Sequence, residues 1–306
     1  MSPVKHLFIV NPVAGRGISL RMARTIDKLF RELKSKYSEI DYEIVYTKHE
    51  GHATEIARDF SSMGEYRIYA VGGDGTLNEV LNGMVGSSST LACIPGGSGN
   101  DFIKSFVPKF DRNKILRDTI LGVEQDVDLG IFDDRYFLNI ASLGFDANVV
   151  KNAERYKDMK MVPSKLSYML GIVNTAMDFK AEKVRLVIDG VESFEEVFMI
   201  AVANGKYYGG GIKIAPLADV TDGLLDILIV KDIDRAKIMR FFPKALAGEH
   251  LGLDEVTFVR ARQIEIFSVD PIYMNIDGEL TARKDVVIRV ADQKIRMVFP
   301  RGWSSK

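Results

Sequence analysis

Along the first 120 or so residues, short apolar runs alternate with longer stretches in which apolar residues recur every three or four positions. The short runs predict strands and the longer stretches predict amphipathic helices. The expected strands cover residues 6–10, 41–47, 67–71 and 91–94, and the expected helices cover 18–36, 52–60 and 76–85. Because alternating strands and helices are typical of a doubly wound parallel sheet, we expect an α/β domain over residues 1–125.

From about Gln125 the pattern changes to short apolar runs that follow one another, separated by D-D, D-G and D-P turn signals. This pattern predicts an all-β, antiparallel sandwich or barrel over residues 126–291. Two helical inserts interrupt it, at about 147–179 and 234–248. Whether the C-terminal tail, about 292–306, returns to the first domain is left open by the sequence. The expected strands are DVDLGIF, RYFLNIAS, EKVRLVID, FEEVFMIAVAN, GLLDILIV, EVTFVRA, QIEIFSV, PIYMNI, DVVIRV and KIRMVF.

Composition narrows the class of protein. The 306 residues carry a formal net charge of -1, which argues against a globally basic nucleic-acid binder. A single cysteine, Cys93, indicates a reducing compartment, and the four histidines have no zinc-ligand spacing. The N-terminus lacks signal-peptide features, and no apolar run is long enough to span a bilayer. We therefore expect a cytoplasmic protein whose contact with membranes is at most peripheral.

Three glycine-rich turns follow predicted strands of the first domain: NPVAGRG (11–17), GGDGT (72–76) and PGGSGND (95–101). In an open parallel sheet, ligands bind at the carboxyl ends of strands, where helix N-termini present free N–H groups. One such turn alone is weak evidence of a ligand site. Three at one edge predict a concavity rich in backbone donors that suits phosphates.

The middle turn also has a purely structural explanation. Thr76 and Glu79 fit a capping box at the start of a helix, and the preceding glycines supply turn geometry. That explanation leaves Asp74 unaccounted for, because a carboxylate repels a phosphate unless a cation or a hydrogen-bond donor intervenes. An acid in this place is compatible with a Mg²⁺-nucleotide site.

At this point the sequence resembles a known family. GGDGTLNEV and IPGGSGNDF (94–102) closely resemble the catalytic domain of diacylglycerol kinases and their soluble bacterial lipid-kinase relatives, which include sphingosine and ceramide kinases. The resemblance runs the length of the chain, through LNIASLGFDA (138–147), ANGKYYGGGIKIAPLADVTDGLLD (203–226) and NIDGE (275–279). GGDGT alone is shared with NAD kinases, whereas GGSGNDF and DGLLD favour lipid kinases.

The resemblance implies a set of nucleotide contacts. Asp74 is expected beside the Mg²⁺-bound phosphates of ATP, and Gly97, Asn100 and Asp101 are expected to shape the cleft near the transferred phosphoryl group. The residues expected to line ATP are Asn11, Pro12, Val13, Ala14, Gly15, Thr47, Gly72, Gly73, Asp74, Gly75, Thr76, Leu77, Asn78 and Ser98.

Two acidic turns of the second domain read as ordinary turns when judged alone. Asp219, Asp222 and Asp226 form an acidic cluster around an Asp-Gly turn, and Asp277-Gly278 is a common hairpin signal. The resemblance implies that Mg²⁺ is held by the Asp222 side chain and by the carbonyls of Asp219 and Leu224. It also implies that the general base for the lipid hydroxyl lies among Asp277 and Glu279, with Asp74 as the third catalytic acid.

Two basic segments are candidates for contact with a membrane surface. The stretch 234–248 combines basic and aromatic residues, and 151–165 has a similar basic bias. For each, a solvated basic face whose apolar side packs on the protein is the more conservative reading. The sequence is silent on oligomeric state and leaves a homodimer open.

The expected protein is therefore a peripheral lipid kinase that transfers the γ-phosphate of ATP to a lipid hydroxyl, with diacylglycerol as the first candidate acceptor. A sphingoid base or undecaprenol is an alternative acceptor, and an NAD kinase is the main alternative enzyme. A non-catalytic lipid-binding regulator on the same scaffold is the alternative of another class. A dinucleotide oxidoreductase is disfavoured, because NPVAGRG stands where a G-x-G-x-x-G would be expected.

Overall fold

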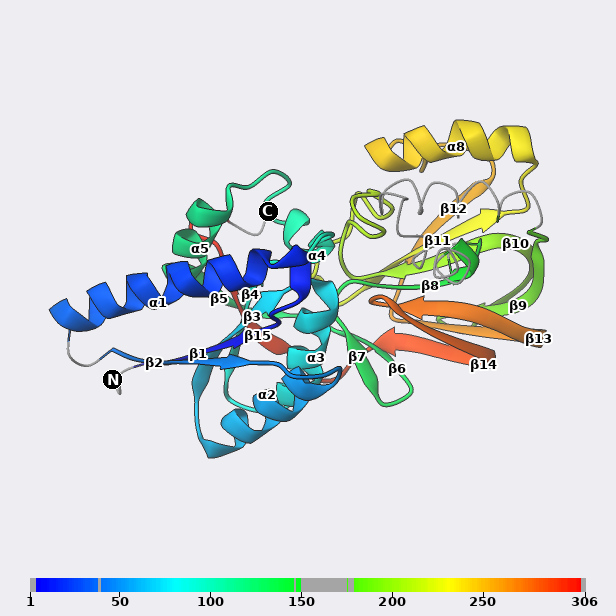
Figure 1. Ribbon diagram of the computed structural model, residues 1–306. Helices are drawn as coiled ribbons and strands as arrows, with labels where there is room; N and C mark the ends of the chain where they lie inside the picture. Colours follow the sequence, from blue (N-terminus) through cyan, green and yellow to red (C-terminus); the bar gives the residue numbers. More distant parts are fainter. Residues whose placement is uncertain (1–3, 38–39, 146, 150–174, 176–178, 304–306) are drawn as a thin grey trace. The chain divides into compact units, whose positions relative to one another are not determined.

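The computed structural model describes residues 4–37, 40–145, 147–149, 175 and 179–303. The chain divides into two compact units, each with its own core. Unit 1 comprises Met1–Leu129 with Ala291–Lys306, and unit 2 comprises Gly130–Val290. Figure 1 shows helices and a sheet in unit 1 and a strand-rich unit 2.

Unit 1 contains a six-stranded sheet in the order β2-β1-β3-β4-β15-β5. The strands pair in parallel from β2 to β15, whereas β5 at the edge runs antiparallel to β15. The C-terminal strand thus belongs to the N-terminal sheet. The strands are β1 (Lys5–Val10), β2 (Asp41–Tyr46), β3 (Tyr66–Gly72), β4 (Thr90–Pro95), β5 (Val123–Val127) and β15 (Ile295–Phe299).

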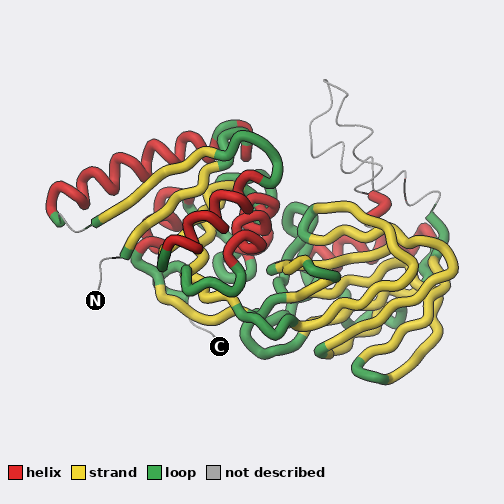
Figure 2. The backbone as a smooth tube through the Cα atoms, turned by 90° about the horizontal axis from the view of Figure 1, so that it is seen from below, coloured by secondary structure: helices red, strands yellow, loops and turns green. Residues whose placement is uncertain are grey.

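Helices cover both faces of this sheet (Figure 2). α1 and α5 pack against one face, where Met22, Phe30 and Leu116 join Phe8 and Tyr69 in one core cluster. Figure 1 shows α2 and α3 on the opposite face. The predicted doubly wound α/β domain is confirmed. The helical segments are a short 3-10 turn (Ala14–Arg16), α1 (Ile18–Lys36), α2 (His52–Met63), α3 (Asp74–Met84), α4 (Asp101–Lys104) and α5 (Arg112–Ile120).

Unit 2 is built from antiparallel strands in the order β12-β11-β10-β8-β13-β14-β6-β7, with β9 between β10 and β13. The predicted all-β second domain is also confirmed. The elements are β6 (Gly130–Phe132), β7 (Arg135–Phe137), β8 (Ile140–Gly144), β9 (Glu182–Ile188), β10 (Val191–Ala203), β11 (Leu225–Lys231), α8 (Arg235–Ala247), β12 (Val256–Ala261), β13 (Gln263–Ile276) and β14 (Glu279–Val290).

β8 and β9 occupy one row between the long strands β10 and β13. β8 pairs with Met199–Ala203 of β10, and β9 pairs with Val191–Val197 of the same strand. β8 ends at Gly144 and β9 begins at Glu182. The helical insert predicted at 147–179 falls between these two strands in the sequence and lies almost wholly outside the described residues.

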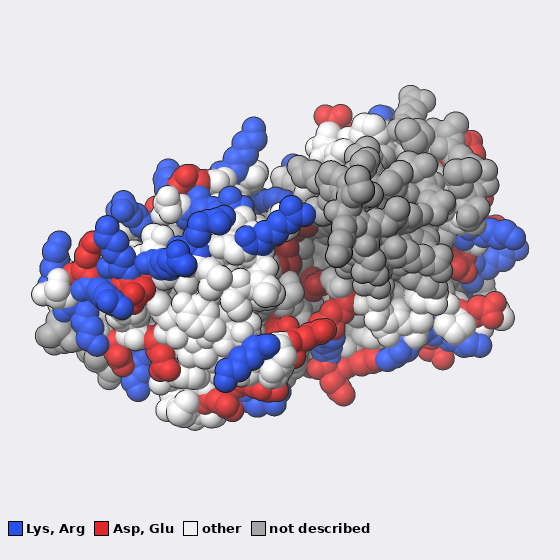
Figure 3. Space-filling model, viewed as in Figure 1, with Lys and Arg blue, Asp and Glu red and all other residues white. Residues whose placement is uncertain are grey.

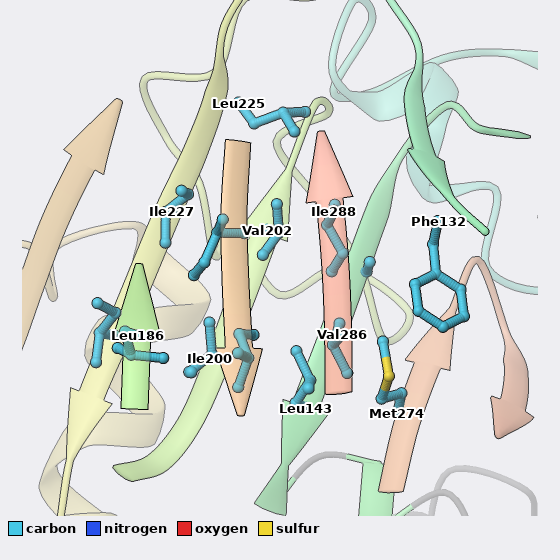
Figure 4. Packing of buried hydrophobic residues seen from close by; sticks show 14 of the residues in the cluster. Phe132, Leu143, Leu186, Ile200, Val202, Leu225, Ile227, Met274, Val286 and Ile288 are labelled. Carbon is cyan, nitrogen blue, oxygen red and sulfur yellow. The ribbon is translucent and has the colours of Figure 1, made fainter. Parts of the chain in front are cut away.

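Strand alternation gives unit 2 two apolar faces. One face forms the interior core, where Leu143, Ile200, Val202 and Ile288 point toward one another (Figure 4). The other face packs against α8 through Ile238 and other buried residues. Side chains on both faces of β10 are buried, which explains its unbroken apolar sequence VFMIAVA.

Three strand predictions were wrong in detail. RYFLNIAS was expected to be one strand, but it divides into β7, which pairs with β6, and β8, which pairs with β10. DVDLGIF was expected to be one strand, but it divides into β5 of unit 1 and β6 of unit 2, because the boundary between units passes through it. The Asp270-Pro271 signal was expected to be a turn between two strands. β13 instead continues through it with a shift of register between Phe267 and Ile272, since a proline is tolerated at a bulge.

Candidate active site

The three glycine turns of unit 1 lie against one another. A Cβ added to Gly15 would lie 2.2 Å from the carbonyl oxygen of Gly96, and one added to Gly97 would lie 2.4 Å from the Cα of Gly73. Gly96 also donates its N–H to the carbonyl of Gly72 at 2.8 Å. Side chains at these positions would separate the turns, so the glycines are required by close backbone approach as well as by turn geometry.

The N-terminus of α3 carries no side-chain cap. The N-cap residue is Gly73, so the helix starts at Asp74 and Thr76 lies inside its first turn. The predicted capping box is therefore wrong. Glu79 instead accepts a hydrogen bond from the N–H of Ala53 at the start of α2, at 3.1 Å. The first N–H groups of α3 remain free of any side-chain cap and suit an anionic ligand.

Next to this helix start is a pocket of about 290 Å³. Asn11 and Thr76 lie on its wall and are joined by a hydrogen bond of 3.1 Å, which ties the first turn to α3. Glu79 also lines the pocket. It was not predicted as a site residue, because its spacing from Thr76 fitted a capping box. The lining residues are Asn11, Pro12, Val13, Thr47, Lys48, His49, Glu50, Ala53, Thr76 and Glu79.

The carboxylate of Asp74 contacts the third glycine turn. It accepts a hydrogen bond from the N–H of Phe102 at 3.1 Å, at the start of α4. Burial raises the pKa of the Asp74 carboxyl, and the nearby carboxylate of Asp101 raises this pKa further. A hydrogen-bond donor therefore accounts for part of the placement of this acid. Burial beside a second carboxylate disfavours the charged form of Asp74, and a nearby cation would favour it.

The turn that precedes α4 is fixed by its own residues. Asn100 adopts a left-handed backbone conformation, and its side chain both accepts from the N–H and donates to the carbonyl of Gly97. Asp101 forms an ion pair with Lys104 at 2.8 Å. Ser98 is exposed at the tip of the turn. Leu77 and Asn78, expected to line the nucleotide, are buried, and their side chains do not line the pocket.

In unit 2, Asp277-Gly278 forms a tight hairpin between β13 and β14, with positive φ at both residues. The Asp277 carboxylate accepts hydrogen bonds from three consecutive N–H groups, those of Leu138 at 3.0 Å, Asn139 at 3.4 Å and Ile140 at 3.0 Å. The hairpin tip is thereby fastened to the segment that enters β8. A carboxylate held this firmly is well suited to orienting a reacting group.

Glu279 has a different partner. Its two carboxylate oxygens face the guanidinium of Arg135 in a bidentate pair. Both side chains are about two-fifths exposed, so the pair contributes little to stability, in the range of 0–1 kcal/mol. The sequence did not single out Arg135, because it lies in a short strand beside a D-D turn and outside the resembling blocks.

The separate sequence blocks of unit 2 meet around Asp277. Asn204 donates its side-chain N–H to the carbonyl of Leu138 at 2.8 Å, and the side chain of Asn139 donates to the carbonyl of Tyr207 at 2.7 Å. LNIASLG, ANGKYYGGG and NIDGE therefore form one hydrogen-bonded cluster. These blocks carry the family resemblance, but the sequence alone indicates no role for Asn139 or Asn204.

The acidic loop before β11 offers hard oxygen ligands. Asp226 is buried: one carboxylate oxygen accepts from Arg260 at 3.0 Å, and the other has no hydrogen-bond partner among the described residues. Burial raises the pKa of Asp226 to about 6, Arg260 opposes the rise, and the charge of Asp222 adds to it. Asp222 itself is exposed and accepts from the N–H of Leu224 at 3.0 Å. The loop fits a Mg²⁺ ion, because a cation would satisfy the buried oxygen and relieve the repulsion.

A second group of potential metal ligands lies at the start of α2. Ligand atoms of His49, His52 and Glu55 lie within 4.8 Å of one another. However, Nδ1 of His52 accepts a hydrogen bond from the N–H of Lys48 at 3.0 Å. A neutral His52 in this state carries its proton on Nε2 and has no lone pair left for a metal. We therefore assign no metal centre here.

The two basic segments named from the sequence have different outcomes. Residues 151–165 lie outside the described residues. In α8, Ile238 and Phe241 are buried against the outer face of the sheet, and Phe242 is partly buried. The apolar side of α8 is therefore largely used for packing. No helix among the described residues is both long and apolar enough to cross a bilayer.

Comparison with known proteins agrees with this geometry. The family model described as "Diacylglycerol kinase catalytic domain" matches residues 5–132. The model described as "YegS C-terminal NAD kinase beta sandwich-like domain" matches residues 139–299, more than half of the chain. Together, the α/β unit with its glycine turns and the sandwich unit with its acidic hairpin define a two-domain kinase of the diacylglycerol kinase type.

Full-length relatives place the chain within that class. "Putative lipid kinase YtlR" of Bacillus subtilis is 31% identical over 89% of this chain and 92% of its own length. "Diacylglycerol kinase" of Bacillus subtilis is 29% identical over 89% of this chain and 88% of its own length. The crystal structure of "a putative diacylglycerol kinase from Bacillus anthracis str. Sterne" has 26% identity and a TM-score of 0.76, covering 98% of both chains. The chain belongs to the bacterial diacylglycerol and lipid kinase family.

Proposed function

We propose that this kinase transfers the γ-phosphate of ATP to the hydroxyl group of a membrane lipid, with diacylglycerol as acceptor and phosphatidic acid as product. The observation that carries the proposal is the meeting of the three glycine turns beside the uncapped N-terminus of α3. Backbone N–H groups that converge in this way suit a chain of phosphates. Curated relatives named diacylglycerol kinase support the choice of acceptor.

The nucleotide would occupy the pocket between Asn11, Thr47 and Glu79, with its phosphates directed toward the start of α3. Asp74 would face the metal-bound phosphates. Mg²⁺ would neutralise the charge that develops on the transferred phosphoryl group. In unit 2, Asp222 would hold a second Mg²⁺ with the carbonyls of Asp219 and Leu224, and Asp226 would supply charge beside it.

Asp277 is the better candidate for the general base. The lipid hydroxyl oxygen forms the new bond to the γ-phosphorus, the bond to the ADP oxygen breaks, and the hydroxyl proton passes to the carboxylate. In a loose transition state, this transfer comes late, so orientation matters more than basicity. Three backbone donors fix the position of Asp277, whereas Glu279 is held only by a partly exposed ion pair with Arg135.

The direct test is incubation with radiolabelled ATP and a panel of acceptors: diacylglycerol, sphingosine, ceramide, undecaprenol and NAD. We expect label in phosphatidic acid. Because some curated relatives are named only as YegS-like lipid kinases, a different labelled lipid would correct the acceptor and retain the lipid kinase. Labelled NADP, with no labelled lipid, would overturn the proposal.

A further inference from the structure

Another pocket of unit 1 lies where β15 ends. The cavity has a volume of about 450 Å³ and shares no lining residue with the pocket beside α3. β15 pairs in parallel with β4, so the chain after Phe299 leaves the sheet at the same edge as the glycine turn 95–101 that follows β4. In an open parallel sheet, this is the edge at which ligands bind. We call the cavity the C-terminal pocket; its lining residues are Phe106, Val107, Lys109, Phe110, Asp111, Lys114, Ile115, Asp118, Pro300, Arg301, Gly302 and Trp303.

Part of the wall of the C-terminal pocket is aromatic and firmly packed. Trp303 stacks on the buried ring of Phe299, with ring centroids 3.8 Å apart and an interplanar angle of 18°. Phe106 packs edge-on against both rings, at 4.7 Å from Phe299 and 5.7 Å from Trp303, and also against Phe102 of α4 at 5.0 Å. Trp303 and Phe106 are partly exposed and line the cavity. Rings that are fixed in this way can stack on a planar ligand at little cost in entropy.

The charged residues of the same pocket favour an anion. Lys109, Lys114 and Arg301 are exposed, and none of them forms an ion pair among the described residues. Two acids are also present. The carboxylate of Asp111 is already engaged as the N-cap of α5, where it accepts two backbone hydrogen bonds of 3.0 and 2.9 Å. A phosphate group would therefore meet three cations, with Asp118 as the one remaining acid, and would form charge-assisted hydrogen bonds.

The charge around the pocket has the same sign. α1 packs on the same face of the sheet as α5 and carries six Lys and Arg residues against two acids. Figure 3 shows Lys and Arg side chains gathered over the side of unit 1 that carries these two helices. The formal net charge of the whole chain is only -1, so the positive potential is local. A local positive potential raises the concentration of soluble anions near the pocket.

We propose that the C-terminal pocket binds a nucleoside phosphate at a site separate from the ATP pocket. The base would stack against Trp303 and Phe106, and the phosphate would lie among Lys109, Lys114 and Arg301. The volume of about 450 Å³ is in the size range of small-molecule sites. A kinase consumes one nucleoside phosphate and releases another, so such ligands are present wherever it works. The inference goes beyond the proposed function, because it holds for any acceptor.

Trp303 is the single tryptophan of the chain, so its fluorescence reports on this pocket directly. The full-length protein is titrated with AMP, ADP, adenosine and inorganic phosphate, without a lipid acceptor. The pocket variant carries Lys114→Gln and Arg301→Gln, and the matched control carries Arg58→Gln and Lys284→Gln at exposed positions elsewhere. A third variant, Thr76→Val, alters the ATP pocket instead. Thermal unfolding checks the fold of each variant.

We expect AMP and ADP to quench the fluorescence of the wild type. Adenosine and inorganic phosphate should each bind at least about tenfold more weakly than AMP, because each meets only one half of the site. Loss of a charge-assisted contact weakens binding by about tenfold, so the pocket variant should bind AMP about a hundredfold more weakly. The matched control and Thr76→Val should stay within a few fold of wild type. The KM of the pocket variant for ATP should stay near that of wild type.

Unchanged quenching in the pocket variant, or an equal loss in the matched control, would overturn the site. Quenching that is lost in Thr76→Val and kept in the pocket variant would do the same, because the signal would then come from the ATP pocket. Inorganic phosphate that binds as tightly as AMP would overturn the nucleoside part of the ligand. Failure of the proposed function gives a different pattern: AMP would quench the wild type and not the pocket variant, while no lipid becomes labelled.

Discussion

The GGDGT turn of unit 1 and the DGE hairpin of unit 2 each place a carboxylate where the chain needs a hydrogen-bond acceptor, but the two carboxylates have different surroundings. Asp277 accepts from three backbone N–H groups, of Leu138, Asn139 and Ile140. Asp74 accepts from Phe102, and its pKa is raised first by burial and then by the neighbouring acid Asp101. The hairpin thus satisfies its carboxylate, whereas the glycine turn leaves its carboxylate short of positive charge.

The two surroundings distinguish a carboxylate that stabilises the fold from one that suits a bound ligand or cation. A carboxylate that accepts several backbone hydrogen bonds is cheap to keep charged and is fixed in place. A carboxylate that is buried beside another acid is costly to keep charged, and such sites are enriched where a ligand or a cation completes the structure. The predictions below test this contrast.

The largest effect is expected for Asp277→Asn. The amide presents N–H groups to backbone donors, so one or more of the three hydrogen bonds is lost. We therefore expect the free energy of unfolding to fall by about 1–3 kcal/mol, because the hairpin is held less firmly against β8. If Asp277 is the base, turnover falls by about a hundredfold to ten-thousandfold, while the affinity for ATP stays near that of wild type. Steady-state kinetics with lipid and ATP varied separately, together with denaturant unfolding, measure both effects.

Glu279→Gln is the matched control for this change. It breaks an exposed pair with Arg135, so we expect a stability loss below about 1 kcal/mol and turnover within about tenfold of wild type. If Glu279→Gln abolishes turnover and Asp277→Asn does not, the assignment of the base is reversed.

The sequence predicted much of this arrangement, because its signals are local. The apolar periodicity gave α1 the same bounds, Ile18–Lys36, that the structure shows. The resembling blocks identified the DGE hairpin. The Glu79 side chain could not be placed in the same way, since its partner, Ala53, belongs to another helix and local spacing favoured a cap on its own helix. The donors to Asp277 were likewise out of reach, because they lie more than 130 residues away in the chain.

An intermediate effect is expected for Asp74→Asn. The amide oxygen can still accept from the N–H of Phe102, while the repulsion from Asp101 disappears. The free energy of unfolding should therefore stay the same or rise. Activity should nevertheless fall, by about tenfold to a hundredfold, if the charge of Asp74 supports the metal-bound phosphates. Thermal unfolding without nucleotide and kinetics at varied Mg²⁺ test the two halves; a parallel loss of stability and activity would remove the contrast with Asp277.

The smallest effect is expected for Asp226, in which one carboxylate oxygen has a partner and the other does not. One oxygen is paired with Arg260, and the other is buried without a hydrogen-bond partner among the described residues. Its pKa is raised from 3.8 to about 6 in the folded protein, so folding favours the protonated form. The resulting stability is fully present below pH ~4 and is lost as the pH rises through ~6, by an amount on the order of 2–3 kcal/mol. In the presence of a chelator, we expect this contribution to disappear between pH 4 and pH 7, relative to an Asp226→Asn variant measured alongside.

If Mg²⁺ binds the acidic loop, adding it at pH 7 should raise the unfolding temperature of the wild type and have little effect on Asp222→Ala. An equal rise in both proteins would place the stabilising ion away from this loop and leave the buried oxygen of Asp226 to be explained by solvent.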